Sequence, residues 1–314
     1  MTIARIHLID AHTPGAFHIV TRCVRPARLS GVDPLSGRDC SHRKRWIEDR
    51  IAMLAERFSV AVYAYAVMSN HVHLVVQTDP QAPTQWDAAE VLRRWFDVSR
   101  RNEPEEARQR RIEAALGNEA LIAKYRERLG SLSWFMRFLN EPIARAINAE
   151  DESTGHFWQG RFRSQALPDE TAVLSAMAYV DLNPVRARVV DVPEAARHVS
   201  IRRRFDALRQ GAPGTLLLPV LGTGPALSVS EREYLTLVDE TGRTVREDKP
   251  GAIPRSLPAI VRRLGLSERA WLRQVQGTES CYWRVIGRFE CFVEKAAQLG
   301  QRWLKGCRLA ASLR

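Results

Sequence analysis

The sequence contains few cysteines, and their number and spacing predict neither disulfides nor a zinc site. The five cysteines are odd in number and include no Cys-x-x-Cys pair, which argues against a disulfide framework and against a zinc-ribbon or zinc-finger site. The sequence also lacks an apolar run long enough to span a bilayer, and its first residues lack the basic-then-apolar layout of a signal peptide. We therefore expect a cytoplasmic protein.

Acidic residues are scarce relative to basic ones. The 314-residue chain carries 47 lysines and arginines against 36 aspartates and glutamates, a formal net charge of +11. Such an excess indicates a polyanionic partner, with nucleic acid favoured over an anionic membrane surface. Residues 255–314 alone hold 12 basic and 4 acidic residues. A hydrophobic content of 45% and a charged content of 26% are ordinary for a soluble globular protein, and the length allows one large domain or two.

Two apolar, β-branched runs flank a pair of turn-forming residues in the middle of the first third of the chain. The runs Val60 to Val67 and His71 to Gln77, joined at Ser69-Asn70, predict a hairpin of two central strands. Side chains two residues apart on a strand share one face, so His71 and His73 are expected to project together. Two adjacent imidazoles form half of a metal site. For an isolated His-x-His, a pair of hydrogen-bonded sheet histidines is the commoner arrangement.

The segments around this hairpin alternate between strand and helix patterns. Residues 17–24 predict a strand, and residues 41–58 predict a helix that Ser41 could cap. After the hairpin, residues 79–130 have the composition of an inserted helical pair, 87–101 and 105–129, whose dense charges are typical of a solvated face. Residues 131–148 predict a core helix, which Pro142 should kink or divide.

Aromatic and basic residues alternate from Gly155 to Leu167, as in a strand with one solvent-exposed face. Interleaved aromatic and arginine side chains suit base stacking and phosphate contact on single-stranded nucleic acid. A sheet with a packed aromatic face and arginines in solvent explains the same pattern equally well. Phe162 is expected to fill the core, whereas Trp158 fits either interpretation.

The next predicted helix begins at Asp169 or Glu170 and carries Tyr179, with Asn183 one turn further on the same face. A phenol and a carboxamide held in this way could serve one site, as nucleophile and as metal ligand. Asn183-Pro184 also has the pattern of an N-cap followed by proline at the first helical position. A tyrosine in such a helix is more often packed against a sheet than used as a nucleophile.

The order strand, helix, strand, strand, helix, strand, helix predicts an α+β fold: a ferredoxin-like sandwich with an antiparallel sheet, a helical insertion and a C-terminal helical extension. Three segments then carry a resemblance to a known family. They are Tyr65-Ala-Val-Met-Ser-Asn-His-Val-His-Leu-Val-Val76, Gly155-His-Phe-Trp-Gln-Gly-Arg-Phe-Arg-Ser164 and Tyr179-Val-Asp-Leu-Asn-Pro-Val-Arg-Ala187. Over residues 15–200 the chain resembles the REP-associated tyrosine transposases, in the single-tyrosine HUH superfamily.

The resemblance implies a function and a site. It implies a transposase, a single-strand DNA endonuclease and strand transferase that cleaves and rejoins DNA at hairpin-forming repeats of the repetitive extragenic palindrome type. Tyr179 would be the nucleophile that forms a 5′-phosphotyrosine, and His71, His73 and Asn183 would bind a divalent metal. Imidazole and carboxamide ligands without a thiolate suit Mn²⁺ or Mg²⁺, and we favour Mn²⁺. A cytoplasmic, nucleoid-associated monomer or homodimer is expected.

The sequence also offers candidate DNA contacts, and two other functions fit the same motifs. Arg22, Arg161 and Arg163 are predicted to contact phosphates, because guanidinium groups match phosphate oxygens, and Trp158 is the candidate for base stacking. One alternative is a repeat-DNA-binding protein, derived from such an enzyme, that does not cut. The other is a metal-dependent phosphoesterase in which water, not Tyr179, is the nucleophile.

The remainder of the chain is predicted to be a basic and mostly helical C-terminal region, residues 201–314, that follows a transposase domain of residues 1–200. Its Gly/Pro-rich linker spans Gly211 to Pro225, and helices are expected near 230–238, 257–264, 267–275 and 282–304. Short helices joined at Gly265 could form a helix-turn-helix-like DNA reader. A basic helical cap on the catalytic domain fits the same pattern.

Overall fold

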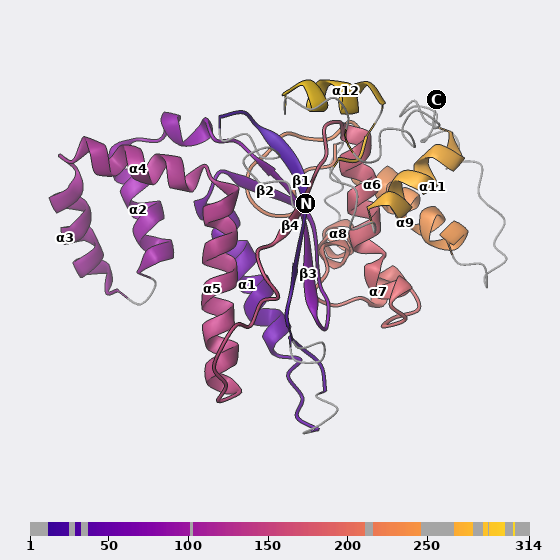
Figure 1. The fold of residues 1–314 in the computed structure, drawn as a ribbon, viewed down its shortest axis with the longest axis horizontal. Helices are drawn as coiled ribbons and strands as arrows, with labels where there is room; N and C mark the ends of the chain where they lie inside the picture. The colour runs from indigo at the N-terminus through magenta and orange to yellow at the C-terminus, as the bar shows by residue number, and fades with distance from the viewer. Residues whose placement is uncertain are drawn as a thin grey trace.

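A computed structural model of the protein describes residues 12–24, 29–32, 37–100, 103–210, 216–245, 267–278, 285–287, 289–298 and 304. At its centre lies a four-stranded antiparallel sheet with the strand order β2-β3-β1-β4. The strands are β1 (Gly15–Arg22), β2 (Val60–Val67), β3 (His71–Thr78) and β4 (Arg163–Ala166). Helix α1 (Arg43–Arg57) connects β1 to β2, and α5 (Leu132–Glu150) precedes β4. This is the predicted ferredoxin-like α+β sandwich (Figure 1).

The predicted hairpin is confirmed, but its first strand is not central. β2 lies at the edge of the sheet, and all eight of its residues are nevertheless buried. Segments from later in the chain cover this edge: the Val62 amide donates to the Leu221 carbonyl (2.9 Å), and the Val67 amide to the His198 carbonyl (3.1 Å). The expectation of a central strand was wrong because burial by loops and burial by a neighbouring strand leave the same apolar sequence pattern.

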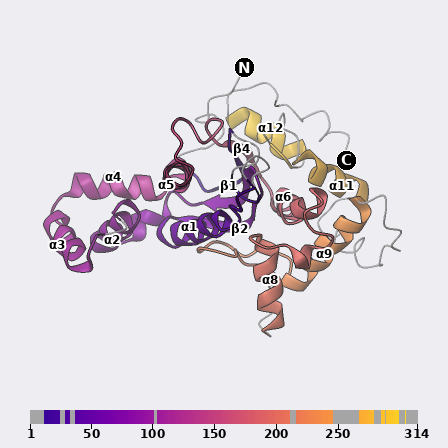
Figure 2. The same ribbon diagram turned by 90° about the horizontal axis from the view of Figure 1, so that it is seen from below.

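Helices cover both faces of the sheet (Figures 1 and 2). α1 and α5 lie on one face, where Phe17 and Ile19 of β1 join their core. The alternation of side chains along β1 directs His18 to the opposite face. That second face is covered by α6 (Glu170–Asp181) together with α8 (Ser200–Arg209), α9 (Glu231–Val245) and α11 (Glu268–Gly277). The sheet therefore presents its polar histidine side to α6.

α5 continues through Pro142 instead of dividing there. A proline has no N–H to donate to the carbonyl four residues earlier, which is that of Phe138. The Nε of Arg50, on α1, donates to the Phe138 carbonyl instead, at 3.0 Å. The neighbouring helix thus satisfies the group that the proline leaves without its helical partner, so the helix is not interrupted.

The insertion forms three α-helices rather than the predicted pair. These are α2 (Ala88–Ser99), α3 (Glu105–Ala115) and α4 (Glu119–Leu129), preceded by the short 3₁₀ helix η2 (Ala82–Gln85). The predicted helix 105–129 is broken before Asn118, whose side chain accepts from the Leu121 amide (3.0 Å) and so caps α4. The three helices extend to one side of the molecule, away from the C-terminal helices (Figures 1 and 2).

The predicted strand over 155–167 is also shorter, because only residues 163–166 form β4. Phe157 and Phe162 are both buried in the same core cluster, next to α5. They are an odd number of residues apart, and a regular strand would direct them to opposite faces. The segment must therefore leave the extended conformation between them, although Cys23 and Trp158 form an isolated bridge. Phe162 is a core residue, as expected.

Two smaller expectations also differ at helix ends. The N-cap of α1 is His42 and not Ser41, and its side chain makes no capping hydrogen bond. In the C-terminal region, the predicted helix 282–304 corresponds to α12 (Phe289–Gln298), and the predicted helix 257–264 lies outside the described residues. Helices 230–238 and 267–275 are confirmed as α9 and α11.

The C-terminal region packs directly on the sheet and its helices. α11 lies against α6, and the Ile286 amide donates to the Ala166 carbonyl of β4 at 3.1 Å. Within the described part of the chain, none of the helices has both the length and the apolar character that crossing a membrane requires.

Candidate functional site

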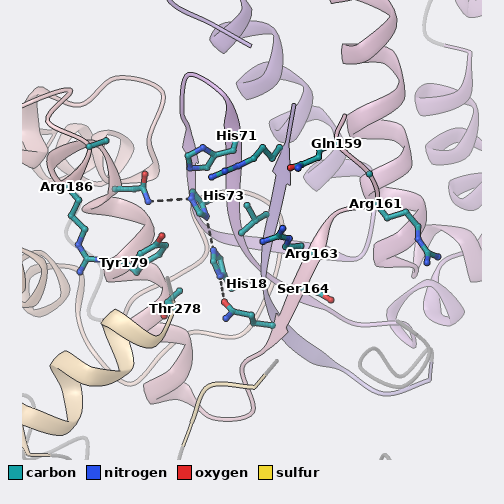
Figure 3. A pocket seen from close by; sticks show the side chains of 16 residues that line it. His18, His71, His73, Gln159, Arg161, Arg163, Ser164, Tyr179, Arg186 and Thr278 are labelled. Carbon is teal, nitrogen blue, oxygen red and sulfur yellow. Dashed lines mark hydrogen bonds between the residues drawn. The ribbon is translucent and has the colours of Figure 1, made fainter. Parts of the chain in front are cut away.

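A cavity of about 700 Å³ lies between the histidine face of the sheet and the end of α6. β1, β3, β4, α6 and the short helix α7 (Asn183–Arg186) all contribute side chains to it, and Thr278 reaches it from the end of α11 (Figure 3). Seven of the eight site residues predicted from the sequence line this cavity: Arg22, His71, His73, Arg161, Arg163, Tyr179 and Asn183. Residues far apart in the sequence are thus brought to one place.

Trp158 is the predicted site residue that lies outside the cavity lining. Its indole Nε1 donates to the Asn140 carbonyl of α5 at 2.8 Å, and its ring packs edge-on against Phe157. This half-buried tryptophan therefore supports the segment that leads into β4. Its role as a DNA contact stays a prediction.

His71 and His73 project from β3 to the same face, as the alternation predicts, with their ring centroids 4.6 Å apart. The Nδ1–H of His71 donates to the Asn70 Oδ1 at 2.5 Å, because an amide oxygen can only accept. In a neutral ring this leaves the lone pair on Nε2. Burial lowers the pKa of His71 to about 4 and that of His73 well below its usual value, so both rings are neutral at pH 7.

α6 begins as predicted, since the Asp169 side chain accepts from the Ala172 amide at 2.8 Å. The helix ends at Asp181, and α7 follows almost directly because Leu182 keeps near-helical angles (φ −85°, ψ −6°). Asn183 is therefore the first residue of α7 and not its cap. Its Nδ2 lies 3.4 Å from the His73 Nε2, which places the carboxamide beside the imidazole.

The ring of Tyr179 lies edge-on to His73, with the centroids 5.5 Å apart, and edge-on to His18, with the centroids 5.8 Å apart. The guanidinium of Arg186 lies over the tyrosine ring, 5.0 Å from its centroid. Tyr179 and Arg186 lie on the helical side of the histidines, and Arg161 and Arg163 lie on the other (Figure 3). The nucleophile candidate thus stands between aromatic edges and a cation.

The charge of the cavity favours an anionic ligand. Four arginines line it, and its lining includes no acidic side chain from the described residues. Arg22, Arg161 and Arg163 are exposed, so their guanidinium groups are accessible to a ligand that enters from solvent. A planar guanidinium group can donate two parallel hydrogen bonds to two oxygens of one phosphate, so a nucleic acid backbone is a well-matched ligand.

Nine lining residues were not predicted as site residues, and four of these have side chains that bear on the chemistry of the site: His18, Gln165, Arg186 and Thr278. Arg186 stands within the third segment that carries the family resemblance, so the segment itself could have signalled it. His18 lies on the predicted first strand, on the same face as Val20 and Arg22. This shared face places His18 beside the histidine pair only once the register with β3 is known. The positions of Gln165 and Thr278 follow from tertiary packing.

The side chains present fit a divalent cation. His71 and His73 offer neutral imidazole nitrogens, and a half-turn of the Asn183 amide would present its oxygen to the same space as the His73 Nε2. No group of three or more His, Cys, Asp or Glu side chains arranged to hold a metal ion occurs among the described residues. A metal here would therefore rest on two imidazoles and one carboxamide, with its other positions open to a substrate.

Comparisons with known proteins gave one structural likeness. No protein-family model and no curated protein matches the sequence. A solved structure described as that of a REP-associated tyrosine transposase bound to a REP hairpin is similar, with a TM-score of 0.40 and 15% sequence identity. The similarity covers 72% of this chain and 93% of that chain.

The buried histidines make stability depend on pH. Burial lowers the pKa of His18 to about 4, as it does for His71. Between pH 6.5 and 4 the unfolded chain binds protons that the folded chain does not, so the free energy of unfolding falls as the pH falls. For the fully buried His18 we expect a loss of about 1 kcal/mol by pH 5.5 relative to pH 7.5.

Urea unfolding of the metal-free protein at pH 7.5, 6.5 and 5.5 measures this loss. His156→Ala, which removes an exposed histidine, is the control and should keep the full pH dependence. His18→Leu should reduce the pH dependence by about 1 kcal/mol over this range, and His71 and His73 should account for the part that remains. An equal pH dependence in both variants would contradict the assignment to the buried ring.

Proposed function

We propose that this protein is a transposase-type enzyme that cleaves and rejoins single-stranded DNA at hairpin-forming repeats. The observation that carries the proposal is the meeting of Tyr179, the His71–His73 pair and Asn183 in one arginine-lined cavity. A phenol, two neutral imidazoles and a carboxamide are the groups needed for a metal-assisted attack on phosphorus.

In the proposed reaction the Tyr179 oxygen attacks the scissile phosphorus. The new bond joins this oxygen to phosphorus, the bond from phosphorus to the 3′ oxygen breaks, and the proton of the phenol is transferred to solvent while the 3′ oxygen takes up a proton. The products are a 5′-phosphotyrosine and a free 3′-hydroxyl. The new phosphotyrosine ester keeps the free energy of the broken phosphodiester bond. Attack by a 3′-hydroxyl therefore reverses the reaction without ATP.

The side chains of the cavity have distinct roles in this proposal. His71, His73 and Asn183 would hold Mn²⁺ or Mg²⁺, which when bound polarises the phosphate oxygens as a Lewis acid. Arg22, Arg161 and Arg163 would hold the phosphates where their guanidinium groups line the cavity. Arg186, above the Tyr179 ring, keeps that ring in place and adds positive charge where the phenol becomes anionic.

The first test is incubation of the full chain with labelled single-stranded DNA that contains repeat hairpins, in Mn²⁺ or in Mg²⁺. The proposal expects a covalent protein–DNA product on a denaturing gel and a released strand that ends in a 3′-hydroxyl. EDTA should abolish both. Hairpin binding without any product would favour the non-cleaving DNA-binding protein, and cleavage without a covalent product would favour the water-dependent phosphoesterase.

The arginines predict a salt-dependent affinity. Arg163→Ala is expected to weaken hairpin binding severalfold and to reduce the slope of log affinity against log salt concentration by about 1, because one phosphate contact is lost. Fluorescence anisotropy with a labelled hairpin at 50 to 300 mM salt measures both quantities. Arg145→Ala, an exposed change on α5 on the other face of the sheet, should leave the slope unaltered. Equal slopes for all three proteins would remove Arg163 from the interface.

A further inference from the structure

Three side chains form a hydrogen-bonded row across the sheet. Gln165 on β4, His18 on β1 and His73 on β3 share the face that lines the cavity. His18 stands directly opposite Gln165 in the β1–β4 register and diagonal to His73, which pairs with Val20. The His18 Nδ1 is 2.6 Å from the Gln165 Oε1, and the His18 Nε2 is 3.0 Å from the His73 Nδ1 (Figure 3).

The direction of each hydrogen bond follows from which atoms can donate and which can only accept. The Gln165 Oε1 has no hydrogen, so the His18 Nδ1 must carry the proton of that bond. His18 is 1% exposed, and its ring nitrogens face two uncharged side chains, Gln165 and His73, so the neutral ring is favoured and its Nε2 has a lone pair. The His73 Nδ1 must then be the donor to this lone pair.

The His73 Nε2 is consequently left without a proton. It faces the Asn183 amide at 3.4 Å, on the side of the cavity proposed for the metal. We propose that Gln165 and His18 act as a two-step relay that fixes the tautomer of His73, with the Nε2 lone pair directed into the site. Both are positioning residues, and the role of the relay in catalysis rests on the proposed function.

The two histidines of the site are held by different devices. Asn70 in the β2–β3 turn accepts from the His71 Nδ1, whereas a second imidazole accepts from the His73 Nδ1. A histidine that binds a metal through one nitrogen commonly donates its other N–H to a fixed acceptor, and loss of that acceptor typically weakens metal binding 10- to 100-fold. In His18→Leu an apolar side chain would stand where the acceptor for the His73 Nδ1 was, so this bond is lost.

The test compares His18→Leu, which removes the acceptor, with His18→Gln, which keeps one. A glutamine side chain ends about as far from the backbone as the histidine Nε2, and its Oε1 can accept from the His73 Nδ1. Gln165→Leu, which leaves His18 in place, is the second disruptive variant. Far-UV circular dichroism and thermal unfolding establish that each variant is folded.

The first readout is the tautomer of His73 in the metal-free protein, from long-range ¹⁵N–¹H correlation spectra at pH 7.5. The wild type and His18→Gln should show a protonated Nδ1 and an unprotonated Nε2 at His73. His18→Leu and Gln165→Leu should shift His73 toward the other tautomer or a mixture. The relay is overturned if the wild-type His73 carries its proton on Nε2, or if neither disruptive variant changes the spectrum.

The second readout is Mn²⁺ affinity from the paramagnetic resonance signal of free Mn²⁺. We expect a loss of 10- to 100-fold in His18→Leu and less than about threefold in His18→Gln. Unchanged affinity in His18→Leu would overturn the relay as a device for metal binding. Failure of the proposed function would give a different result. If the wild type binds no Mn²⁺ and cuts no DNA, but its His73 has the expected tautomer and His18→Leu changes it, then the relay exists and the proposed enzyme activity is wrong.

Discussion

Tyr179→Phe is expected to abolish cleavage of hairpin DNA, by at least about 10⁴-fold, and to leave hairpin affinity within about twofold. The change removes one oxygen and keeps the ring, so the edge-on contacts with His73 and His18 and the contact with the Arg186 guanidinium persist. The large loss is expected because an enzyme without its nucleophile retains only binding and electrostatic stabilisation.

The measurement is the rate of strand cleavage and of covalent adduct formation under single-turnover conditions with Mn²⁺. Tyr125→Phe is the matched control, since Tyr125 lies in the helical insertion, stacked on Trp95 and away from the cavity, and this variant should cleave at the wild-type rate. Cleavage by Tyr179→Phe at a rate near that of the wild type would identify water as the nucleophile. Equal losses in both variants would point to a general effect on folding.

The sequence predicts well the part of the fold whose local signals agree. Between Val60 and Gln77, two apolar and β-branched runs joined by a turn at Ser69-Asn70 predict the hairpin, and His71 and His73 share a face as a consequence. The cap at Asp169 likewise identifies the start of α6, and from it the position of Tyr179. Local rules were sufficient for these elements because local hydrogen bonds determine them.

The features that the sequence left open or did not predict are those that distant contacts determine. α5 continues through Pro142 because Arg50, 88 positions away in the chain, supplies a donor to the Phe138 carbonyl. The segment before β4 departs from a strand because Phe157 and Phe162 reach one core. His18 and Gln165 meet only through the pairing of β1 with β4, across 147 positions. Strand register between distant segments leaves no periodic signal in a single sequence.

Asp181, at the end of the helix that carries Tyr179, is fully buried and connects that helix to two others. Its carboxylate accepts from the Ser200 Oγ (2.5 Å), the Ile201 amide (3.0 Å) and the Tyr234 hydroxyl (2.6 Å). Burial raises the pKa of this carboxyl, against the opposing effect of these hydrogen bonds. The group therefore holds α8 and α9 to the end of α6, immediately before Asn183.

Asp181→Ala is expected to lower the free energy of unfolding by about 3 to 5 kcal/mol, because it leaves the buried Ile201 amide and Tyr234 hydroxyl without an acceptor and leaves the Ser200 hydroxyl only its longer bond to the Tyr65 carbonyl. Chemical denaturation measures the change. Tyr234→Phe, which removes one donor and leaves the other two bonds, should cost about 1 kcal/mol. Asp206→Ala, at a half-exposed surface ion pair on α8, should cost less than about 1 kcal/mol. If Asp181→Ala loses no more stability than Asp206→Ala, then packing, and not this carboxylate, holds the helices to α6. If the loss is large and the protein that remains folded also cleaves more slowly, then the same carboxylate keeps Tyr179 and Asn183 against the histidine face.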